Sequence, residues 1–172
     1  IRDRIYYDYL LFCTDPLTTS KILYDNSSYV EKKNYLGSSG KLTMFFKKPV
    51  EWKKEKALDT SFRFIFSQDT LDGLNDSGQM ALNSQNNYTP GYIQIYPDGA
   101  AQRKLNNSEN FDKIICFTKN FSFNKNSDDL IYAEQNIIEK ISKLISNPED
   151  LVGTKFITPK DLNEVFFFPK GN

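Results

Sequence analysis

"DDLIYAEQNIIEKISKLISNP", residues 128–148, is the stretch that decides the fold class. Its apolar side chains recur at helical spacing and form one stripe: Leu130, Ala133, Ile137, Ile138, Ile141, Leu144 and Ile145. Asp128 and Asp129 complement the positive end of a helix, and Pro148 stops it. The pattern predicts an amphipathic helix over residues 129–146 with its stripe in the core, although a helix that docks on a partner has the same pattern.

Several short strands are predicted on either side of this helix. The segment "SFRFIFSQ" places Phe62, Phe64 and Phe66 at period two, which predicts a half-buried strand. Further strands are expected in "KLTMFF" (41–46), "FDKIICFTKNFSF" (111–123) and "VFFF" (165–168). Residues 69–91 are rich in Asp, Asn, Ser and Gly, and predict a long loop with one short helical turn.

The segment "GYIQIYPDGAAQRKL", residues 91–105, predicts a hairpin. Ile93 and Ile95 face one side of the first strand, whereas Tyr92 and Tyr96 face the other. The Pro-Asp-Gly sequence at 97–99 suits a tight turn, so a second strand is expected to begin near Ala100.

The two ends of the chain predict helices and caps. "IRDRIYYDYLLFC" predicts a helix over Asp3 to Cys13, and Asp15 is expected to cap a second helix that begins at Pro16. Near the other end, a strand is followed by a helical turn capped by Thr158, with Asp161 three residues later.

The expected fold is therefore α+β. It has an antiparallel sheet of about five or six strands, an N-terminal helix, and the long amphipathic helix packed on the sheet. Residues 1–172 are expected to form a single globular domain, because this length suits one core. The chain begins at Ile1 without Met, which suggests a mature or truncated fragment lacking an N-terminal signal or anchor.

Composition argues against several classes of function. The chain has no histidine, so a His-dependent triad is impossible and the commonest metal ligand is missing. Lys plus Arg equals Asp plus Glu, at 22 each, so no overall field favours nucleic acid, and binding to it would need a local basic face. We expect no cofactor, no metal site and no catalytic residues. The alternative is a carboxylate-based, His-independent hydrolase whose site assembles only in the fold.

The two cysteines, Cys13 and Cys116, are too few for a zinc cluster. They could form one long-range disulfide in an oxidising compartment, or remain small buried hydrophobes.

The hairpin segment "YIQIYPDGAAQ" resembles part of the minor pseudopilins of type II secretion and DNA-uptake systems. In that family an apolar strand ends in a Pro-Asp-Gly turn and follows a long amphipathic helix. The resemblance covers about 20 residues, and the helix at 129–146 and the tail beyond it depart from the family pattern. It implies an assembly protein whose membrane contact is made only through an N-terminal segment that this chain lacks.

The leading functional hypothesis is a non-catalytic interaction or assembly domain of an extracytoplasmic or surface structure, although a cytoplasmic location stays open. A protein partner or self-assembly is expected, and nucleic acid is not favoured. The candidate contact residues are Tyr88, Tyr92 and Tyr96, because the last two lie opposite the core-facing isoleucines and amphipathic rings suit contact surfaces. A second layer covering these tyrosines is the competing interpretation.

Overall fold

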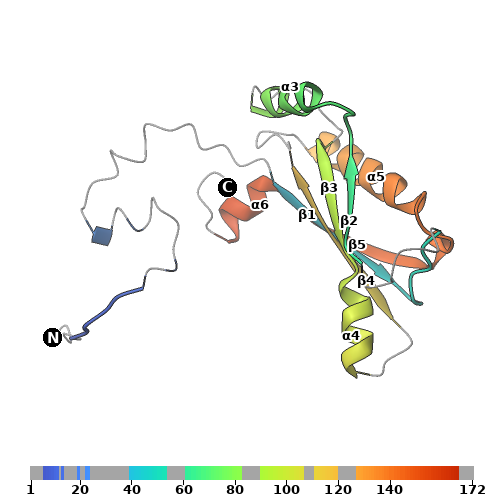
Figure 1. Cartoon of the computed structure of the whole chain (residues 1–172), viewed down its shortest axis with the longest axis horizontal. Helices are drawn as coiled ribbons and strands as arrows, with labels where there is room; N and C mark the ends of the chain where they lie inside the picture. The colour runs from blue at the N-terminus through green and yellow to red at the C-terminus, as the bar shows by residue number, and fades with distance from the viewer. Residues whose placement is uncertain are drawn as a thin grey trace. The chain divides into compact units, whose positions relative to one another are not determined.

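The computed structural model describes residues 6–11, 13, 19, 22–23, 39–53, 61–82, 90–106, 111–119 and 127–166. The chain divides into two units, Ile1–Tyr35 and Leu36–Asn172. All of the described strands and helices with assigned bounds belong to the second unit (Figure 1).

The helix predicted over Asp3 to Cys13 is wrong where the structure describes it. Residues 6–11 and Cys13 are not helical, and Tyr6, Tyr9 and Leu11 are almost fully exposed. A short helix without a face to bury is marginal in water, which explains the difference. Thr19, Ile22 and Leu23 are helical, in agreement with the helix predicted after Pro16.

The second unit contains one five-stranded antiparallel sheet, in the order β2-β3-β4-β1-β5. The strands are β1 (Gly40–Phe46), β2 (Arg63–Phe66), β3 (Tyr92–Tyr96), β4 (Asp112–Lys119) and β5 (Leu151–Ile157). Consecutive strands β2, β3 and β4 form a meander, and β1 lies between β4 and the C-terminal strand β5. The predicted α+β fold with about five antiparallel strands is confirmed.

Helices connect and flank these strands. They are α3 (Leu71–Leu82), α4 (Asp98–Asn106), α5 (Ser127–Ser142) and α6 (Pro159–Glu164), with a short 3₁₀ helix at Pro148–Asp150. In the part of the chain that the structure describes, no helix is both long and apolar enough to span a bilayer.

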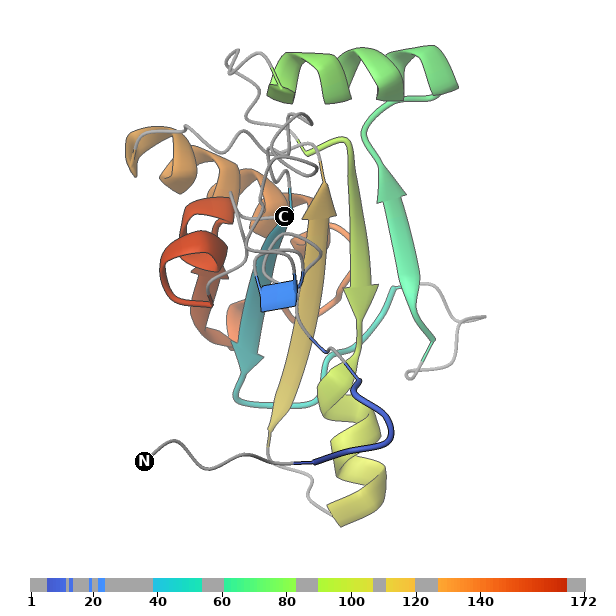
Figure 2. The ribbon, with the colours of Figure 1, turned by 90° about the vertical axis from the view of Figure 1, so that its left-hand side faces the viewer.

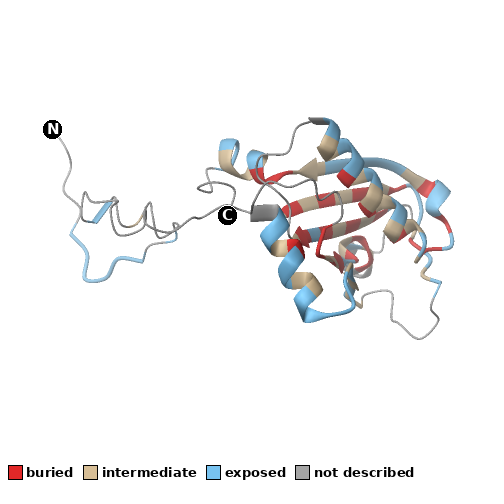
Figure 3. Ribbon diagram, turned by 90° about the horizontal axis from the view of Figure 1, so that it is seen from above, coloured by how far each residue is buried: buried red, intermediate tan, exposed pale blue. Residues whose placement is uncertain are grey.

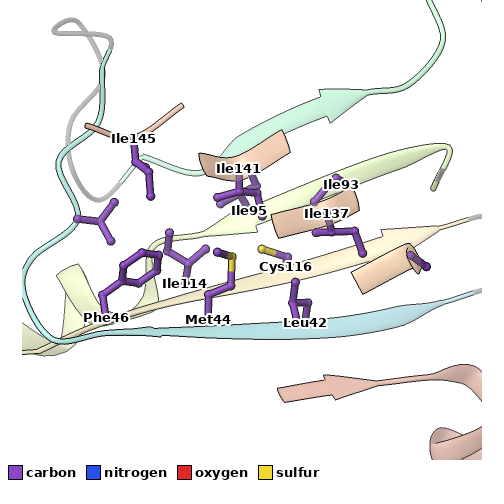
Figure 4. Close-up of a cluster of buried hydrophobic side chains, with 12 residues drawn as sticks. Leu42, Met44, Phe46, Ile93, Ile95, Ile114, Cys116, Ile137, Ile141 and Ile145 are labelled. Atoms are coloured by element: carbon purple, nitrogen blue, oxygen red, sulfur yellow. The ribbon is translucent and has the colours of Figure 1, made fainter. Parts of the chain in front are cut away.

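The core lies between α5 and one face of the sheet (Figures 1 and 4). The central strands contribute every second side chain, as the alternating burial of β1 and β4 requires (Figure 3). The helix predicted over 129–146 packs its stripe on the sheet, but α5 ends at Ser142 rather than at 146. Leu144 and Ile145 reach the core from the segment after the helix, where Ile145 forms a β-bridge with Trp52. The fully buried members are Leu42, Met44, Phe46, Ile93, Ile95, Ile114, Cys116, Ala133, Ile137, Ile141 and Ile145.

Two further predicted elements are wrong. Residues 71–82, expected in a long loop, form α3, whose first turn is capped by the Thr70 Oγ1, which accepts a hydrogen bond of 3.1 Å from the Gly73 amide. The second strand of the hairpin is instead α4, because the residues after the glycine, "AAQRKL", are strong helix formers. β3 therefore pairs with β2 and β4 rather than with the segment that follows it.

The C-terminal segment follows the prediction as far as Glu164. Thr158 and Asp161 form the reciprocal capping box, and Pro159 is the first residue of α6. Of the strand predicted at 165–168, Val165 and Phe166 lie in a turn, and the other two residues lie outside the described part.

Candidate interaction surface

The face of the sheet opposite α5, which we call the outer face, carries a cluster of aromatic side chains. Figure 2 looks onto this side of the sheet. The strand register places paired residues in rows across it: Phe66, Tyr92 and Lys119 in one row, Phe64, Gln94, Phe117, Lys41 and Ile157 in the next, and Tyr96, Ile115, Thr43 and Lys155 in the third. Phe62, just before β2, stacks on Tyr96 and extends the third row. Most of these rings thus lie on β2 and β3, whereas the lysines lie on β4, β1 and β5.

The rings contact one another across the strands. Phe62 stacks on Tyr96 at 5.3 Å between centroids, and Phe64 stacks on Phe66 at 5.9 Å. Tyr96 makes an edge-on contact of 5.6 Å with Phe117. Cross-strand aromatic pairs of this kind stabilise a sheet, so these rings contribute to the stability of the fold.

The rings nevertheless remain open to solvent. Exposed fractions are 52% for Phe62, 47% for Phe64, 58% for Phe66, 37% for Tyr96 and 39% for Phe117. Contiguous exposed apolar patches of this kind are uncommon on monomers, and in other proteins they often coincide with interaction sites. The described residues therefore do not form a second layer over this face.

At the described strand positions of the outer face, every charged side chain is a lysine: Lys41, Lys113, Lys119 and Lys155. Lys113 is paired with Asp98 at 2.5 Å. The Lys119 ammonium donates to the Ser39 hydroxyl at 2.5 Å, and the Lys41 ammonium lies 5.7 Å from the Phe117 ring centroid. Of the described carboxylates, none forms an ion pair with Lys41, Lys119 or Lys155.

The structure places Tyr92 and Tyr96 as the sequence predicted, opposite the buried Ile93 and Ile95. Tyr88 lies outside the described residues. Sequence reasoning missed the phenylalanines of β2 and Phe117 as members of the same surface. The signal was present in the period-two pattern of residues 62–66, but that pattern does not say which face is buried, because Ile65 on the other face is also apolar.

The inner face of β2 carries Arg63 and Ile65. Ile65 faces the core beside Ile93, and the Arg63 guanidinium lies 3.7 Å from the centroid of the Trp52 ring. This cation–π contact lets an arginine occupy the inner face at the edge of the sheet.

Cys13 belongs to the first unit and Cys116 to the second, so the disulfide considered between them stays a prediction. Both are free thiols: Cys13 is exposed, whereas Cys116 is fully buried beneath α5. Burial raises the pKa of the Cys116 thiol far above its usual value, because the thiolate would have no water around it. Cys116 therefore acts as a small core hydrophobe, the other interpretation of these cysteines.

Two carboxylates are buried among the described residues, Asp112 and Asp150, and both have structural partners. Asp112 accepts from the Val50 amide at 2.8 Å and pairs with Arg103 at 2.5 Å, which joins α4 to β4 and to the loop after β1. The other, Asp150, accepts from Asn147 Nδ2 at 2.9 Å and pairs with Lys47 at 3.3 Å. The hydrogen bond from Asn147, followed by the one from Lys47, holds the pKa of Asp150 below its usual value. Each carboxylate thus holds segments of chain together.

The described residues contain no group of three or more His, Cys, Asp or Glu side chains that could hold a metal ion. No protein-family model, no curated protein and no solved structure matches this chain.

Proposed function

We propose that this chain is a non-catalytic interaction domain that binds its partner through the outer face of the sheet. The observation that carries the proposal is the exposure of five aromatic rings on one continuous face, with lysines beside them. The other face is fully used by α5, so the outer face is the one left for a partner. Assembly within an extracytoplasmic structure and the pseudopilin resemblance stay predictions, because they rest on the sequence alone.

The double substitution Tyr92→Ser with Tyr96→Ser tests this proposal. Because these side chains are partly exposed, the double variant should keep its fold, with a loss of stability of about 1–2 kcal/mol from the lost ring contacts. Crosslinking to partners should be lost, and so should any self-association that sedimentation velocity detects for the wild-type chain. A matched control is Ile131→Ser with Tyr132→Ser, which removes an exposed aliphatic and an exposed aromatic side chain from α5.

Two outcomes contradict the proposal. If the variant unfolds at room temperature, the two tyrosines are needed for folding, as they would be if a second layer of the protein covered them. If its stability matches that of the α5 control, and so does its binding to every partner tested, protein or oligonucleotide, the outer face is not a binding surface.

A further inference from the structure

We infer that the outer face binds single-stranded nucleic acid, with bases stacked on its aromatic rings and phosphates held by a line of three lysines. The inference rests on the proposed function, since it names the partner of the same surface. Aromatic side chains beside a positively charged track are the combination that binds single strands without sequence preference.

The local charge is the first argument. The chain as a whole is neutral, yet the strand positions of the outer face carry lysines and no carboxylate. With Lys113 neutralised by Asp98, three cations remain: Lys41, Lys119 and Lys155. Fields from surface charges fade over about 8–10 Å in physiological salt, so a ligand on this face responds to these lysines rather than to the net charge. A second copy of the same face would bring lysines against lysines, which disfavours face-to-face dimers.

The position of the lysines is the second argument. Lys119 lies on β4, Lys41 on β1 beside Phe117, and Lys155 on β5 beside Thr43, which itself pairs with Ile115. Each lysine is thus one strand across and two residues along from the one before it. Strand spacing of about 4.8 Å and a rise of about 3.4 Å per residue put their Cα atoms about 8 Å apart on a diagonal line.

The aromatic rings lie on one side of this line. A strand of nucleic acid that follows the diagonal with its phosphates places its bases over β2, β3 and β4. Phe62 and Tyr96 are within 20° of parallel, and Phe64 and Phe66 within 18°, so bases can prolong stacks that already exist. A duplex hides its bases within its own stack, which is why a single strand fits this face.

Fluorescence anisotropy with labelled oligodeoxythymidylate and oligouridylate of about 20 nucleotides tests the inference, since typical sites span about 4–16 nucleotides. The wild-type chain should bind both, and a duplex of equal length at least about tenfold more weakly. Between about 50 and 200 mM salt, three phosphate contacts predict a slope of about −2 in log affinity against log salt.

Substitution of the three lysines by glutamine (K41Q, K119Q and K155Q together) should reduce the salt slope to near zero and weaken binding by about tenfold or more at low salt. The control is the triple change K48Q, K53Q and K143Q, which removes the same charge from exposed lysines outside the sheet. This control should bind within about twofold of wild type.

Phe64→Ser with Tyr96→Ser should weaken binding by about 5- to 150-fold for each stacked base that is lost, with little change in the salt slope. Circular dichroism confirms that each variant is folded. The lysine and aromatic variants therefore separate the two halves of the recognition.

Three results would overturn the inference: no binding of either oligonucleotide, equal binding of the duplex, or equal loss in both lysine triples. A copolymer of glutamate and tyrosine serves as a probe for an acidic protein partner. If it binds and the oligonucleotides do not, the partner is an acidic protein segment, and the proposed interaction function stands without the nucleic acid. If neither probe binds and the tyrosine variant also leaves assembly and crosslinking unchanged, both proposals fail.

Discussion

Ile141→Ala removes three carbon atoms from the centre of the layer between α5 and the sheet. Ile141 is fully buried, as are Ile137 one turn earlier on α5 and Ile145 just after the helix. At about 0.8 kcal/mol for each buried methylene, the lost transfer free energy is about 2.4 kcal/mol. The cavity that remains adds to this cost, so the free energy of unfolding should fall by about 2–5 kcal/mol.

The matched control is Ile131→Ala, which deletes the same atoms from the same helix at a residue that is 54% exposed. That change should shift stability by no more than about 0.5 kcal/mol. Urea unfolding can be followed by the fluorescence of Trp52, the single tryptophan, which pairs with Ile145 at the end of the core. Equal, small effects at the two isoleucines would show that the α5 stripe does not pack on the sheet, and that the helix docks on a partner instead.

Three further predictions follow from buried groups. Gly99→Ala should lower the free energy of unfolding by about 1–3 kcal/mol, measured by thermal unfolding, because a Cβ there would overlap the Asp112 carboxylate and the backbone next to it. The control Gly153→Ala has open space around it and should leave stability unchanged. Equal effects of the two substitutions would refute the close approach of α4 to β4. Cys13 should react at once with a thiol reagent and Cys116 only after unfolding, and a mass lower by two hydrogens without reductant would instead reveal a disulfide. The pKa of Asp150 is lower in the folded chain than in the unfolded chain, where it is about 4. Ionised Asp150 therefore stabilises the fold at pH values above about 4, and this stabilisation is lost as the pH falls through the pKa of the folded state. In Asp150→Asn the free energy of unfolding should therefore fall less steeply as the pH is lowered below about 4. An unchanged pH dependence of stability would contradict the lowered pKa of Asp150.

Much of the fold could be predicted because its main elements have strong periodicity. The α5 stripe, the alternation of β1, β3 and β4, and the Thr158 capping box each specify their structure locally. α3 and α4 were missed for a common reason. Turn-forming residues such as Asp98 and Gly99 outweighed the cap and helix-forming residues around them, and these short helices have no long apolar stripe.

The candidate site was predicted only in part. Alternation placed Tyr92 and Tyr96 on the face away from Ile93 and Ile95. The buried face could be assigned because isoleucine is less polar than tyrosine. For Phe64 and Ile65 both faces are apolar, so the buried side depended on the pairing of β2 with β3. The line of three lysines could not be predicted from the sequence, because Lys41, Lys119 and Lys155 come together only through the pairing of three strands distant in the chain.

The position of β1 also determines when the sheet can be completed during synthesis. Lys41 in β1 pairs with Ile157 in β5, which lies near the other end of the second unit, while β2, β3 and β4 pair with their sequence neighbours. A nascent chain can form the meander early, but β1 remains a bare edge on its β5 side until the last strand leaves the ribosome. Contacts this distant in sequence make folding slow, and they leave a strand edge that can template association with other chains. A chain interrupted before Leu151 is therefore expected to aggregate, and chaperones that shield β1 have their greatest effect in that interval.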